Sequence, residues 1–135
     1  MRGWHVSADK AGCHSVVDLL DRMQEASVAS YRTIALTKPS AAISAVPNFG
    51  PPARDAPGSM RLVYSPAHQG LTISEEDERL FVTFGRKRLP ELKSGFVEIG
   101  IGGGDFAVCP DNKKAELPIW FWWMPDYCGN RLAPA

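Results

Sequence analysis

The sequence of 135 residues shows no excess of charge of either sign, because 15 Lys and Arg residues balance 15 Asp and Glu residues. A protein that binds nucleic acid needs a basic surface to displace the counterions around the phosphates. A strongly acidic mimic of nucleic acid would need the opposite imbalance. The composition therefore argues against both classes, and we expect no nucleic-acid partner.

Cysteine is scarce, and the three that occur (Cys13, Cys109 and Cys128) are scattered and form no Cys-x-x-Cys pair. An odd, scattered set is not a disulfide framework and is typical of a reducing compartment. The closely spaced ligand pairs of a zinc site are missing as well. We therefore predict no metal and no cofactor.

Long hydrophobic runs are also missing. Residues 1–10 hold no apolar stretch of signal-peptide length, and no segment approaches the roughly 20 apolar residues of a membrane span. We expect a cytoplasmic protein that does not enter a membrane. The length predicts a single domain, 1–135, with a core large enough to need no disulfides.

Catalytic patterns are equally sparse, since His5, His14 and His68 lie far apart in the sequence. A Cys–His pair could still be assembled in space from Cys109 or Cys128 with His68, although buried inert cysteine is the commoner state. The glycine-rich stretch 100–104 precedes a predicted strand and lacks a following Gly-Lys-Ser/Thr, which argues against phosphate binding. We therefore assign no catalytic residue.

Hydrophobic periodicity predicts two helices and a set of strands. The helices are expected over 14–27 and 90–99, and the strands over 31–37, 60–64, 71–73, 80–84, 105–109 and within 117–127. A long Pro- and Gly-rich loop is expected at 38–58, where five of the eleven prolines lie. This order predicts an α+β domain: a mainly antiparallel sheet of five or six strands, with both helices packed on one face.

An acidic hairpin is predicted where Glu75, Glu76, Asp77 and Glu78 separate two alternating runs. Its tip is either a solvated turn that keeps the sheet end from sticking to neighbours, or a contact for a basic groove on a partner. The cations at 86–88 follow the hairpin and could neutralise the tip across it.

Three of the four tryptophans lie within residues 120–123. A strand directs Trp120 and Trp122 to one face and Phe121 and Trp123 to the other. Such a strand is either the centre of a small sheet or carries a tryptophan that belongs to a binding hot spot. The loop at 38–58 is likewise either a surface excursion or a contact segment that presents Phe49 and Arg54 to a partner.

Several short motifs together resemble small bacterial immunity proteins. They are Leu71-Thr72-Ile73 and Leu80-Phe81-Val82 around a charged tip, a helix with Leu89 and Leu92, Gly104-Asp105-Phe106, and Trp120-Phe121-Trp122-Trp123. The resemblance implies a protein that binds the toxin domain of a contact-dependent or type VI secretion system and occludes it. It supplies no catalytic residue, because occlusion needs a complementary surface and no reaction centre.

The binding hypothesis therefore assigns one protein partner, a cognate toxin domain that acts in the cytoplasm. Its predicted partner-binding residues are Glu75, Glu76, Asp77, Glu78, Phe49, Arg54, Trp120, Trp122, Asp126 and Tyr127. The alternatives are a small enzyme whose loop covers a pocket with Asp105, His68 and a cysteine, and an adaptor subunit. The sequence leaves the oligomeric state open.

Overall fold

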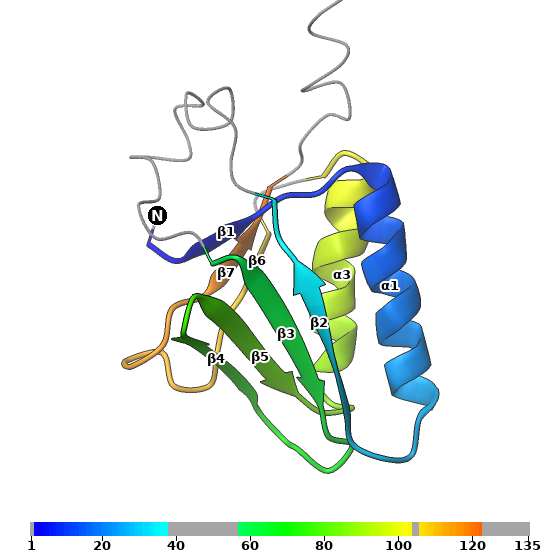
Figure 1. Ribbon diagram of the computed structural model, residues 1–135, viewed down its shortest axis with the longest axis vertical. Helices are drawn as coiled ribbons and strands as arrows, with labels where there is room; N and C mark the ends of the chain where they lie inside the picture. Colours follow the sequence, from blue (N-terminus) through cyan, green and yellow to red (C-terminus); the bar gives the residue numbers. More distant parts are fainter. Residues whose placement is uncertain (1, 38–56, 104–105, 123–135) are drawn as a thin grey trace, which may run out of the picture.

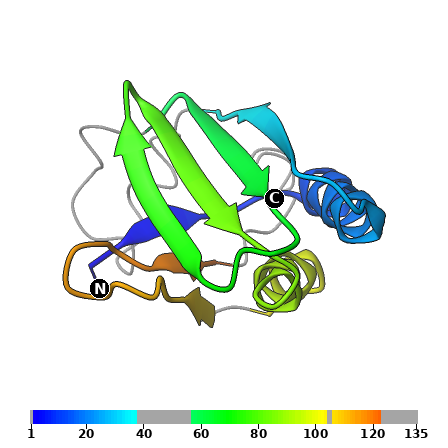
Figure 2. The same cartoon turned by 90° about the horizontal axis from the view of Figure 1, so that it is seen from below.

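The computed structural model of the chain describes residues 2–37, 57–103 and 106–122, and shows an α+β fold. Its elements are β1 (Trp4–Val6), α1 (Lys10–Glu25), β2 (Ser30–Ala35), β3 (Ser59–Tyr64), β4 (Leu71–Glu76), β5 (Arg79–Phe84), α3 (Leu89–Gly100), β6 (Phe106–Val108) and β7 (Ile119–Phe121). The two helices lie side by side (Figure 1). The four-stranded sheet forms one layer of the fold. Helix α3 and the three-stranded sheet lie together on one side of that layer (Figure 2).

The expected single sheet of five or six strands is wrong, because the described strands form two sheets. One sheet has the order β2-β3-β5-β4 and the other the order β1-β7-β6. Each contains one parallel pair, β3 with β5 and β1 with β7, so neither is purely antiparallel. The inner position of β5 has a physical reason: β5 alternates buried and half-buried residues along its whole length, whereas the second half of β4 is exposed and polar. A strand of that kind is suited to a sheet edge.

The acidic hairpin is confirmed. Strands β4 and β5 pair antiparallel from Leu71 opposite Phe84 to Glu76 opposite Arg79. Both strands continue further toward the tip than the predicted 71–73 and 80–84, so the turn contains only Asp77 and Glu78. Alternation places Leu80, Val82 and Phe84 against the core, as the sequence pattern predicts.

The aromatic strand is the centre of a small sheet, in agreement with the first of the two interpretations. Strand β7 lies between β1 and β6 and pairs antiparallel with β6. Strand β1 was not foreseen. It is three residues long, and its parallel register of Trp4 with Ile119 joins segments from opposite ends of the chain.

Both predicted helices are present, and α1 differs from its predicted bounds of 14–27 at both ends because it spans Lys10–Glu25. Helix α3 begins and ends within one residue of the predicted 90–99. Helix α1 begins four residues earlier than the predicted 14, because the Asp9 carboxylate accepts the Gly12 N–H at 2.7 Å and caps the first turn. Neither helix among the described residues is long and apolar enough to cross a membrane.

One hydrophobic core joins both sheets and both helices. It contains Leu20 from α1, Leu62 and Val82 from the four-stranded sheet, Leu92 from α3 and Phe121 from β7, each less than 2% exposed. Helix α3 approaches β7 at Gly95, where an added Cβ would lie 2.6 Å from the Phe121 ring. The helix can pack this closely only because that position has no side chain.

Candidate functional site

The tip of the β4–β5 hairpin has an unusual backbone. Asp77 and Glu78, the two turn residues, both have positive φ angles, 52° and 61°. Positive φ at both central positions is the geometry of a type I′ turn, for which Asn-Gly and Asp-Gly are the favoured sequences. No glycine relieves the strain here. Asp77 is of a residue type that tolerates this conformation, whereas Glu78 stands where glycine is favoured and carries a side chain that rarely adopts it.

The tip also carries four negative charges that form no ion pair with a described residue. The side chains of residues 75–78 are exposed. No ion pair joins any of the four carboxylates to another group in the described ranges. Of the cations at 86–88 that could neutralise the tip, Arg88 does not pair with any of its carboxylates. That side chain pairs with Glu91 at 2.9 Å and Asp111 at 2.6 Å, at the other end of β5.

Backbone contacts hold the tip in place. The Gly58 N–H donates to the Glu78 carbonyl at 2.8 Å, and the Leu36 N–H donates to the Gly58 carbonyl at 3.0 Å. Nearby, the Arg79 Nε–H donates to the Ser59 hydroxyl at 3.0 Å. The acidic turn is therefore fixed to the ends of β2 and β3, where the chain leaves for and returns from residues 38–56. The predicted site residues Phe49 and Arg54 lie in that segment, outside the described residues.

A second surface feature lies on the outer face of the four-stranded sheet. The Arg61 guanidinium carbon lies 4.5 Å from the centre of the Tyr31 ring and 5.7 Å from that of Phe81, and its Nε–H donates to the Thr33 hydroxyl at 2.9 Å. Such contacts between a cation and aromatic rings fix the position of the guanidinium. Tyr31 remains 59% exposed. Sequence reasoning missed this group, although all four residues occupy outward positions of the alternating strands.

The two tryptophans predicted to bind a partner, Trp120 and Trp122, differ in how far they are buried. Trp122 is only 7% exposed, stacks with His5 and donates its indole N–H to His5 Nδ1 at 2.7 Å. Trp120 is half-buried, stacks on Trp122 and donates its indole N–H to the Arg2 carbonyl at 3.1 Å. Of the two, Trp120 has the more accessible ring. The predicted Asp126 and Tyr127 lie outside the described residues.

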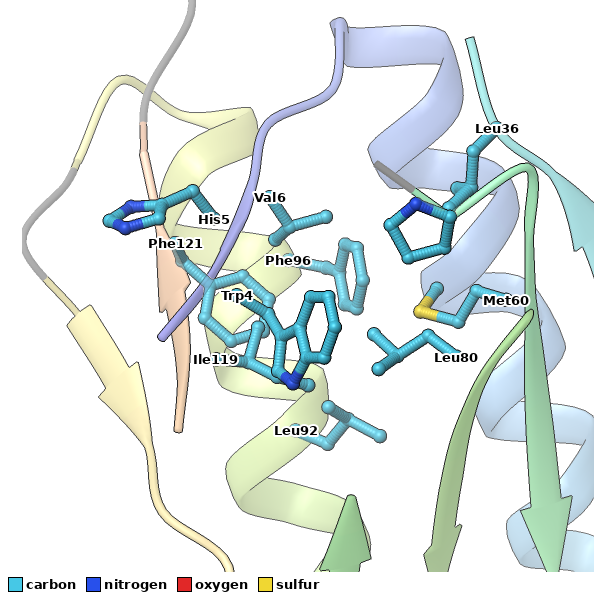
Figure 3. Close-up of a pocket in the computed structure, with 11 residues that line it drawn as sticks. Trp4, His5, Val6, Leu36, Met60, Leu80, Leu92, Phe96, Ile119 and Phe121 are labelled. Carbon is cyan, nitrogen blue, oxygen red and sulfur yellow. The ribbon is translucent and has the colours of Figure 1, made fainter. Parts of the chain in front are cut away.

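A cavity of about 60 Å³ lies between α3 and the two sheets (Figure 3). Its lining is apolar apart from His5 and consists of Trp4, His5, Val6, Leu36, Pro57, Met60, Leu80, Leu92, Phe96, Ile119 and Phe121. Neither His68 nor either described cysteine lines it, so the catalytic group considered from the sequence is not assembled there. Asp105 lies outside the described residues. Within the described ranges, no group of three or more His, Cys, Asp or Glu side chains is arranged to hold a metal ion.

Comparison of the chain with protein-family models, with curated proteins and with solved structures found no match. Among the described residues, the acidic tip and the Tyr31–Arg61–Phe81 group are two features that lie on the surface.

Proposed function

We propose that this chain is an immunity protein, which binds a cognate bacterial toxin domain one to one and blocks it by occlusion. The observation that carries the proposal is the acidic tip: four consecutive exposed carboxylates without ion pairs in the described chain, on a turn whose two residues are both left-handed. The motifs that resemble immunity proteins include this hairpin.

The strained turn supports a role in binding. A non-glycine residue in the left-handed region costs on the order of 1 kcal/mol, and such strain tends to persist at functional sites. A turn that served only to reverse the chain would be more stable with glycine at one of these positions. Asp77 and Glu78 instead keep two carboxylates at the outermost point of the hairpin.

The charge at the tip defines the partner surface. Exposed carboxylates that form no ion pair with a described residue attract a basic groove over several ångströms and accelerate encounter, an effect that salt screens. Because the chain as a whole is neutral, the attraction is local to the tip. The partner that fits is a toxin domain whose basic groove receives the hairpin.

The outer sheet face supplies the second part of the proposed interface. Tyrosine and arginine are over-represented among residues that dominate binding energy. Arg61 is held between Tyr31 and Phe81 and bonded to Thr33, so little side-chain entropy is lost when a partner covers it. Strand β5 connects this group directly to the tip, because it carries Phe81 and begins at Arg79.

The experiment measures binding of the purified chain to the toxin encoded by the neighbouring gene. Replacing both Glu75 and Glu76 with Ser should slow association about tenfold at low salt and weaken its salt dependence, with little change in dissociation. The matched control replaces two exposed acidic residues of α1, Asp18 and Glu25, with Ser. It changes the net charge equally, far from the tip, and should leave association near that of the unmodified chain.

Protection of cells gives the second readout. Expression of the chain should rescue cells from this toxin and from no unrelated one, with inhibition complete at one equivalent in vitro. The proposal fails if the chain protects at far below one equivalent, or if the tip and control variants associate with the toxin at the same rate.

A further inference from the structure

The two edges of the four-stranded sheet are treated differently. At the β4 edge, the Glu116 carboxylate accepts the Ile73 N–H at 2.8 Å, and the Asp111 N–H donates to the Leu71 carbonyl at 3.0 Å. The segment after β6 therefore covers the first half of this edge. Exposed sheet edges invite pairing with other strands, and coverage of this kind prevents it.

At the β2 edge, no described segment makes hydrogen bonds of this kind. The Leu36 N–H bonds to the Gly58 carbonyl, and the register pairs Ile34 with Met60, so Ser30, Arg32 and Ile34 direct their backbone groups toward β3. Alternation then directs the N–H and C=O groups of Tyr31, Thr33 and Ala35 away from the sheet. None of these groups has a hydrogen-bond partner in the described ranges, and all three residues are exposed. Helix α1 packs mainly against α3.

We propose that a second copy of this chain pairs with the β2 edge, strand β2 against strand β2 in antiparallel fashion, and joins the two four-stranded sheets into one across a two-fold axis. A two-fold contact of this kind brings the same surface of both copies together, so the edge must be complementary to itself.

The sequence of β2 meets that condition in one register. In an antiparallel pair, residues with outward backbone groups must lie opposite each other. Of the registers that pair most of the strand, one centres on Arg32 and places two guanidinium groups face to face. The other centres on Thr33, sets the large Tyr31 opposite the small Ala35, and sets Arg32 opposite Ile34. Like charges directly opposite destabilise a sheet, so the Thr33-centred register is the favoured one.

The dimer edge and the acidic tip, which carries the proposed function, lie on different strands. The acidic tip belongs to β4 and β5, and β4 lies three strand spacings from β2, about 14 Å across the sheet. Pairing through β2 therefore leaves the tip accessible to a toxin domain. Tyr31 and Thr33 belong both to the β2 edge and to the outer-face group of the proposed interface. The tip variant at Glu75 and Glu76 therefore separates the two proposals, because it should slow toxin association and leave the dimer unchanged.

The test is the mass of the full chain in solution by sedimentation equilibrium across a range of concentrations. A reversible dimer is expected. In hydrogen exchange, the amides of Tyr31, Thr33 and Ala35 should gain at least tenfold protection as the concentration passes through the dimerisation range, while exposed amides elsewhere do not.

Proline variants separate this edge from the other. Thr33→Pro removes an outward N–H and fills the space of the incoming strand, yet leaves the ladder with β3 intact, so it should abolish the dimer. Glu75→Pro makes the same change at an outward position of β4 and should dimerise like the unmodified chain. Ala35→Pro serves as a second edge variant if Thr33→Pro does not fold. A chain that stays monomeric at millimolar concentration, or a dimer that survives both edge variants, overturns the proposal.

Discussion

At the scale of single residues, the strain at Glu78 can be measured directly. Glycine populates the left-handed region without the steric penalty of a side chain, so Glu78→Gly should raise the free energy of unfolding by about 0.5–1 kcal/mol. Urea denaturation measures the change. If the variant is less stable than the unmodified chain, the turn does not store the strain that its φ of 61° implies.

Glu75→Gly provides the matched control for that substitution. It removes the same side chain three residues earlier, from a β4 residue that pairs with Leu80 and has an ordinary strand conformation. Glycine inside a strand loses more backbone entropy on folding than other residues, so the free energy of unfolding of Glu75→Gly should fall by about 0.5–1 kcal/mol. Opposite signs at the two positions would separate turn strain from the mere removal of negative charge.

At Gly95, replacement by a residue with higher helix propensity should lower the stability of the fold. Alanine favours a helix over glycine by about 1 kcal/mol. At this position, however, the added methyl would lie 2.6 Å from the Phe121 ring, and Gly95 and Phe121 are both buried. Overpacking of a core costs about 1–3 kcal/mol, so Gly95→Ala should lower the urea midpoint. The neighbouring exposed Ser94→Ala should leave the midpoint within experimental error or raise it slightly.

At the scale of elements, the covered edge of β4 depends on one carboxylate. Glu116→Ala leaves the Ile73 N–H without its acceptor and should cost about 1 kcal/mol, with faster hydrogen exchange at the Ile73 amide. Glu116→Gln keeps a side-chain oxygen at the same place and should retain most of the protection. Equal exchange at Ile73 in both variants would mean that the glutamate does not cover this edge.

Elements with a strong local pattern could be predicted from the sequence, and pairings between distant segments could not. Alternation and the acidic insertion are sufficient to predict the β4–β5 hairpin, and Pro90 with a helical spacing of leucines is sufficient for α3. The parallel pairing of β3 with β5 could not be predicted, because it requires knowing that β4, and not β5, lies at the edge of the sheet. Strand β1 has only three residues and is defined by its partner β7, more than 110 residues away.

The candidate site divides in the same way. The acidic tip is visible as a run of like charges, so its exposure could be predicted. Its strained backbone could not, because φ depends on the exact length of the turn, and the strands extend further than the alternation indicates. The Tyr31–Arg61–Phe81 group draws one residue from each of three strands. Such a group becomes visible only once strand order and register are known.

At the scale of the whole molecule, two sheets share one core, and this has a consequence for unfolding. Phe121 of the three-stranded sheet packs edge-on against Phe96 of α3, while Met60 and Leu80 of the four-stranded sheet belong to the same buried cluster. Because both sheets contribute to one core, neither sheet can bury its apolar face without the other. Unfolding should therefore be a single cooperative transition, as in most domains of this size.

The tryptophans make that expectation measurable. The chain's four tryptophans occupy positions 4, 120, 122 and 123, and the three that are described lie in β1, in β7 or directly after β7. Tryptophan fluorescence therefore reports on the three-stranded sheet, whereas amide exchange at Leu62 and Val82 reports on the four-stranded sheet. In urea both probes should give the same midpoint, and the cavity-forming variant Phe96→Ala, expected to cost about 3–5 kcal/mol, should lower both midpoints equally. A fluorescence change that precedes loss of protection at Leu62 and Val82 would show that the small sheet unfolds independently and that the core is not shared.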